Sequence, residues 1–93
     1  IRAGVEVRHG VHKATGGLIR AIFQVDADED VIQHVELSGD FFFYPAERLT
    51  DLEAALVGVR LDEVEQAVAR FYADHEVDSP GVEPLDFARV LTS

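Results

Sequence analysis

The sequence has 93 residues and 47% hydrophobic content, which suits one small folded domain and excludes a disordered chain. It contains no Cys, which excludes disulfides, thiolate metal sites and thiol catalysis. No apolar run approaches the roughly 18 residues that span a membrane, and no segment has the order of a signal peptide. We therefore expect one domain over residues 1–93 in the cytoplasm. Because translation starts at Met and the sequence has none, we also expect residues before Ile1.

The charge of the chain is strongly acidic and unevenly distributed. Its 18 Asp and Glu against 8 Lys and Arg give a net charge of −10, which should repel nucleic acid and anionic membranes. Residues 1–20 carry four cations and one acid, a net +3, whereas residues 21–93 carry four cations and seventeen acids, a net −13. This asymmetry favours an anion site or a docking surface near the N-terminus. A chance gathering of arginines on one strand is the alternative.

Three strands are predicted in the first half of the chain. Alternation of apolar and polar residues is typical of half-buried strands, and it occurs over residues 3–8, 18–25 and 31–37. In the third segment, the buried face is expected to hold Val31, Val35 and Leu37.

Turn-forming residues separate these segments. Residues 9–17 are predicted to form a glycine-rich loop, and the acidic residues 26–30 a turn that closes an antiparallel hairpin. Residues 38–40, Ser-Gly-Asp, are expected to break the third strand.

Three helices are predicted in the second half. Pro45 suits the first turn of a helix over 46–57, which Gly58 would end. Asp62 and Glu65 resemble a capping box at the start of a second helix that ends near residue 75. A short third helix begins at Pro84 and is expected to bury Phe87, Val90 and Leu91.

The order of elements, strands first and helices after, predicts the fold class. It favours an α+β domain in which an antiparallel sheet of about three strands has its helices packed on one face. There is no repeat and no linker.

The sequence matches no known metal-binding or catalytic motif in full. Asp26, Asp28 and Asp30 resemble half of a calcium loop, but Val31 stands where Gly is needed and Leu37 where Glu is needed. The four His are scattered, and no nucleophile or phosphate-loop motif is present. We therefore expect no catalytic residue, no metal site and no cofactor held by this chain itself.

Two segments remain as candidates for function. In residues 13–17, glycine amides and Lys13 could bind a phosphate or carboxylate, although a structural turn would use the same residues. In residues 38–45, four consecutive aromatic residues cannot all face a core, because strand side chains alternate. Some should lie at a surface that suits a protein contact, unless the segment turns a corner that buries both faces.

The spacing of these residues resembles a known family. The pattern Lys13-x-x-Gly16-Gly17-Leu18-Ile19, then Gly39-Asp40-Phe41-Phe42, then Leu52-Glu53-x-x-Leu56-x-Gly58 is similar to the C-terminal domain of bacterial-type lipoate–protein ligases. It is also similar to the separate small subunit of archaeal-type ligases. The resemblance runs from about residue 5 to 91. It implies contact with the adenylate or the large subunit through Lys13, Gly16, Gly17, Gly39, Asp40 and Phe41.

The resemblance also implies a function. In this family the large domain binds lipoate and ATP with Mg, forms lipoyl-AMP and passes the lipoyl group to acceptor domains of E2 or H proteins. The small domain, a fold similar to SufE and NifU, is needed for the activation step. The Arg-Arg and catalytic Lys signature of the large domain is absent, so this chain should not ligate lipoate alone.

The resemblance assigns roles to two charged residues, and two other functions remain open for the chain. Lys13 would lie near phosphate or near an acid of the partner, and Asp40 would cap the turn that follows it. The first alternative is a free-standing module that binds a carrier domain. The second is an independent enzyme, for which the sequence offers neither nucleophile nor metal site.

Overall fold

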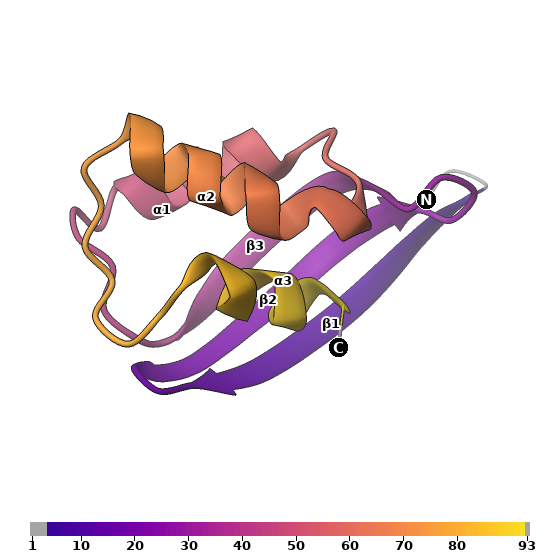
Figure 1. Cartoon of the computed structure of the whole chain (residues 1–93). Coiled ribbons are helices and arrows are strands. Elements are labelled where there is room, and N and C mark those ends of the chain that lie inside the picture. Colours follow the sequence, from indigo (N-terminus) through magenta and orange to yellow (C-terminus); the bar gives the residue numbers. More distant parts are fainter. Residues whose placement is uncertain (1–3, 93) are drawn as a thin grey trace.

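The computed structural model describes residues 4–92, and Figure 1 shows them as a sheet with helices on one side. Three antiparallel strands lie in the order β1-β2-β3: β1 (Val5–Ala14), β2 (Gly17–Asp26) and β3 (Val31–Asp40). The helices are α1 (Arg48–Leu56), α2 (Val64–Asp74) and α3 (Pro84–Thr92), with a short 3-10 turn, η1 (Leu61–Glu63), before α2. The predicted α+β class and one-sided helix layer are confirmed.

The first hairpin is longer than predicted. β1 continues to Ala14 and pairs with β2 residue by residue, from Val5 opposite Asp26 to Ala14 opposite Gly17. The predicted loop over residues 9–17 is therefore wrong, and only Thr15 and Gly16 form the turn. The alternation continues through this segment: Gly10 and Ala14 are buried, while the side chains between them point outward or lie at intermediate depth.

The third strand also departs from its prediction. It continues through Ser38 and Gly39 to Asp40, which pairs with Leu18, so the expected break is wrong. The buried residue near its start is Ile32 rather than Val31. A β-bulge causes this change of face, because Val25 pairs with Ile32 while the neighbouring Gln24 pairs with His34.

The helices match the prediction in position but not at every end. α1 begins at Arg48, and Pro45 lies before it in a turn in which the Arg48 amide donates to the Pro45 carbonyl at 3.0 Å. The predicted capping box is absent, because α2 follows directly from η1 and has no side-chain cap. Gly58 follows α1 with a φ of +88°, and α3 begins at Pro84, both as predicted.

The hydrophobic core lies between the inner face of the sheet and the helices. β2 contributes Ile19, Phe23 and Val25, and every second residue of that strand is buried. The helices contribute Leu52, Leu56, Val64, Val68, Phe71, Phe87, Val90 and Leu91. Within residues 4–92, no helix has both the length and the apolar character needed to cross a bilayer.

Within the described part of the chain, no helix covers the opposite side of the sheet (Figure 1). We call it the outer face, because its side chains alternate with the buried ones. It is made of Val5, Val7, His9, Val11, Lys13, Leu18, Arg20, Ile22, Gln24, Asp26, His34, Glu36, Ser38 and Asp40.

Phe87 gives a direct test of the one-sided core. Its ring is fully buried, and it meets Phe41 and Phe43 edge-on at centroid distances of 6.1 and 6.3 Å. Phe87→Ala should lower the free energy of unfolding by about 3–5 kcal/mol, measured by urea denaturation. On the same helix, Leu85 is 42% exposed, so Leu85→Ala should cost less than about 1 kcal/mol. Equal effects of the two substitutions would contradict this packing.

Candidate functional site

The residues singled out in the sequence come together at one end of the sheet. Lys13 pairs with Leu18 across β1 and β2, and Leu18 pairs with Asp40 across β2 and β3. Gly16 and Gly17 lie in and beside the turn between β1 and β2, next to Gly39, Asp40 and Phe41 at the end of β3. The two candidate segments are thus one corner of the molecule.

Backbone contacts hold this corner together. A Cβ atom on Gly17 would overlap the carbonyl oxygen of Asp40, and one on Gly39 would overlap that of Leu18. Gly17 and Gly39 also have φ values of +139° and +141°, which favour glycine. Close approach of β2 and β3 at this end therefore requires both residues.

Gly16 connects the same corner to the loop before α3. A Cβ on Gly16 would overlap the Pro80 carbonyl oxygen, and the Gly16 amide donates a hydrogen bond to the Gly81 carbonyl at 2.8 Å. Since that amide is already paired, it is not available to an anion. These contacts support the structural interpretation of the glycines, and the charge for an anion would have to come from Lys13.

The two charged residues of the corner point to the outer face. Lys13 and Asp40 are exposed, and neither side chain has a hydrogen bond or ion pair with any of residues 4–92. They lie on either side of Leu18, roughly 10 Å apart by the spacing of strands. The expected cap by Asp40 is wrong, because β3 continues through Asp40 and its carboxylate accepts no hydrogen bond from any of residues 4–92.

The aromatic segment divides between core and surface. Phe43 is buried and Phe41 half-buried, and the Phe43 ring meets Tyr72 edge-on at 6.1 Å. Phe42 and Tyr44 are 61% and 51% exposed, and their rings stack at 5.8 Å. The expectation that some of these residues reach the surface is confirmed.

Hydrogen bonds fix this segment to the loop before α3. The Tyr44 amide donates to the Asp78 carbonyl, and the Asp78 amide donates to the Tyr44 carbonyl, both at 2.8 Å. The Tyr72 hydroxyl lies 2.7 Å from the Ser79 Oγ, which itself donates to the Val82 carbonyl at 2.9 Å. Burial raises the pKa of Tyr72, the Ser79 hydrogen bond lowers it less, and the nearby Asp86 charge raises it further.

A second polar link connects β1 to α3, and the sequence analysis did not identify it. His12 Nε2 lies 2.9 Å from Asp86 Oδ1, and both side chains are half-buried. Asp86 Oδ2 also accepts the Glu83 amide at 2.8 Å, at the start of α3. Because Asp86 is in the third position of a helix that begins at Pro84, the sequence could have predicted its bond to the Glu83 amide. No local pattern predicts its contact with His12 on β1.

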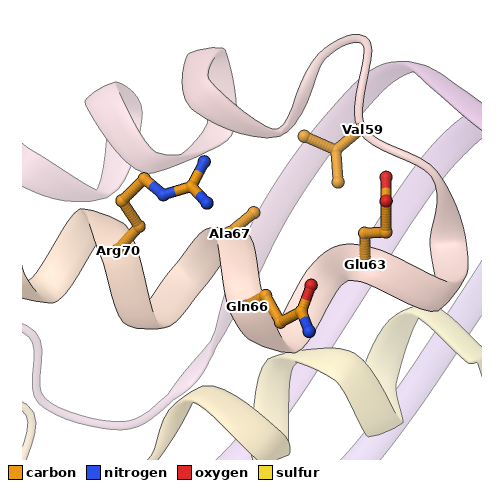
Figure 2. A pocket seen from close by; sticks show the side chains of 5 residues that line it. All are labelled: Val59, Glu63, Gln66, Ala67 and Arg70. Atoms are coloured by element: carbon orange, nitrogen blue, oxygen red, sulfur yellow. The ribbon is translucent and has the colours of Figure 1, made fainter.

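Two pockets lie near these segments. One of about 270 Å³ lies beside the corner and is lined by Ser38, Gly39, Phe41, Phe43, Ala46 and Leu49. Another of about 150 Å³ lies beside α2, where Figure 2 shows Arg70 and Glu63 at opposite ends with Ala67 and Val59 between them. Among residues 4–92, no three His, Asp or Glu side chains gather as a metal site. What the corner offers is a rigid frame, two unpaired charges and exposed apolar surface.

The glycine contacts predict an unequal effect of adding one methyl group. Gly39 and Gly58 both have positive φ values, but only at Gly39 would the Cβ overlap a backbone atom, since nothing lies within 4 Å of a Cβ on Gly58. Gly58→Ala should cost about 1 kcal/mol of unfolding free energy from backbone strain. Gly39→Ala should cost at least about 2 kcal/mol more, measured by urea denaturation. If the two substitutions lower the free energy of unfolding equally, β2 and β3 do not approach as closely as described.

Comparison with known proteins identifies the family. The family model for the bacterial lipoate protein ligase C-terminus matches residues 8–91. A curated relative, lipoate-protein ligase A subunit 2 of Thermoplasma acidophilum, is 37% identical over 79 residues, which cover 85% of this chain and 81% of that protein.

A solved structure agrees with the sequence matches. It comes from a structural analysis of an archaeal lipoylation system, a bi-partite lipoate protein ligase and its E2 lipoyl domain from Thermoplasma acidophilum. Its chain superposes with a TM-score of 0.82 at 33% identity, covering 94% of this chain and 96% of its own length. The fold, the family match and the curated relative agree with one another, and the chain belongs to the family of the lipoate–protein ligase C-terminal domain.

Proposed function

We propose that this chain is the accessory subunit of a two-part lipoate–protein ligase, needed for the large subunit to activate lipoate with ATP as lipoyl-AMP. The observation that carries this proposal is the match over 94% of the chain to a chain of a bi-partite ligase. Lipoate and ATP with Mg bind to the large subunit, which holds the catalytic groups. The acceptor domains of E2 and H proteins are therefore partners of the assembled enzyme, and of this chain only indirectly.

The geometry of the corner suggests what the accessory subunit contributes. Lys13 is one residue before Ala14 at the end of β1, on a hairpin that the contacts of Gly16 and Gly17 hold against neighbouring backbone. Its ammonium group has no partner among residues 4–92, so it is free to meet a phosphate or an acidic side chain. Contact of this corner with the large subunit would exclude water beside the adenylate and strengthen such a charge interaction.

Pyrophosphate release tests the accessory role. The large subunit of the source organism, assayed with lipoate and ATP, should release pyrophosphate at least tenfold faster when this chain is added in equimolar amount. Heat-denatured chain serves as the control for a nonspecific protein effect. If the large subunit alone reaches the same rate and the chain changes neither kcat nor KM, the proposal is wrong.

Substitution of Lys13 tests the charge contribution separately. In the assembled enzyme, Lys13→Ala should lower kcat/KM for ATP about tenfold, and Lys13→Arg should keep most of the activity, because a positive charge remains. Arg89→Ala is the matched control, since Arg89 is an exposed cation on α3. Wild-type kinetics for Lys13→Ala would remove Lys13 from the site and leave the accessory role intact.

A further inference from the structure

Four aliphatic side chains form an apolar strip on the outer face. In the register of the hairpin, Val7, Ile22, Val11 and Leu18 are successive diagonal neighbours across β1 and β2, about 7–8 Å apart. Val7 is 46% exposed, Ile22 49% and Val11 56%. The outer face of a sheet that meets water normally carries polar residues, so a strip of this kind marks a contact surface.

Positive charge lies along the same strip. Lys13 pairs with Leu18 and Arg20 pairs with Val11, and neither cation has an ion pair with any of residues 4–92. Two acids of the outer face, Glu36 and Asp40, lie on β3, and the third, Asp26, lies at the opposite end of β2 from Leu18. Two cations and three acids give the outer face a formal charge of −1 with His uncharged, on a chain whose net charge is −10. The β1–β2 half is therefore complementary to a partner surface that is apolar with acidic neighbours.

A second copy of this chain does not suit the strip. In a symmetric dimer two bodies of net charge −10 would come together. A different protein does not meet this difficulty if its docking surface is apolar with acidic groups around it. The solved relative comes from the analysis of a bi-partite ligase, which has a second part of a different kind.

We propose that the outer face, centred on Val11 and Ile22, is the surface that docks the large subunit of the ligase. This inference rests on the proposed function, because it names the surface through which the accessory role is exerted. Lys13 lies at the end of the strip, in the corner described above, so docking would also bring the corner against the large subunit. The strip supplies apolar contact, and Arg20 and Lys13 supply orientation and ionic steering.

Binding measurements with charged variants test this surface. Affinity for the purified large subunit is measured by calorimetry for the wild type, Ile22→Glu, Arg20→Glu and the control Val57→Glu. Val57 is 50% exposed but follows α1 in the helix layer. Ile22→Glu should weaken binding at least thirtyfold and Arg20→Glu at least fivefold, whereas Val57→Glu should change it less than twofold. Thermal melting confirms folding of each variant.

The outcomes separate this inference from the proposed function. If Ile22→Glu and Arg20→Glu both bind like the wild type, the outer face is not the docking surface, although the accessory role stands. If the wild-type chain does not bind the large subunit at all, both proposals fail. If the chain alone sediments as a dimer that Ile22→Glu dissociates, the strip joins two copies and the inference is overturned.

Discussion

Close backbone contact at one end of the sheet is the constraint on which the rest of the structure depends. Gly17 and Gly39 let the ends of β2 and β3 approach, and Gly16 lets the hairpin turn meet the loop before α3. That loop leads α3 onto the inner face, where Phe87 fills the core beside the aromatic segment. A side chain at any of these three glycines would separate elements that are distant in sequence.

A second consequence is the difference between the two faces of the sheet. The three helices of residues 4–92 pack on the inner face, so the core of this part of the chain uses one side of β2 and leaves the other side uncovered (Figure 1). The same strand therefore carries core residues such as Ile19 and exposed residues such as Ile22. An accessory subunit has a physical use for this arrangement, because folding is completed by one face while the other remains available to a partner.

Local sequence patterns predicted which helices and strands form. The length of β1 and the position of the β-bulge depend on pairing between distant strands. The three helices were predictable because leucines and aromatics recur at helical spacing, and Gly58 and Pro84 mark an end and a start. The length of β1 was not, because glycines that indicate a loop are also those that a tight hairpin requires. The bulge that buries Ile32 depends on the β2–β3 register, which no local pattern contains.

The same distinction applies to the candidate site. The sequence identified the residues of the corner, and the family resemblance joined its two segments, but the orientation of Asp40 required the full length of β3. The link between His12 and Asp86 joins residues 74 positions apart, and only the fold reveals it. The exposure of Val11 and Ile22 follows from the fold, because the helices of residues 4–92 pack on the other face of the sheet.

The central claim is that the outer face docks a ligase subunit, and Lys13 offers the most direct measurement of it. Lys13 is the sole Lys of the sequence, so acetylation of its peptide, followed by mass spectrometry, reports on one side chain. With saturating large subunit, the rate of acetylation of Lys13 should fall at least tenfold relative to the free chain. An unchanged rate in a chain that is demonstrably bound would contradict the claim and place the interface elsewhere.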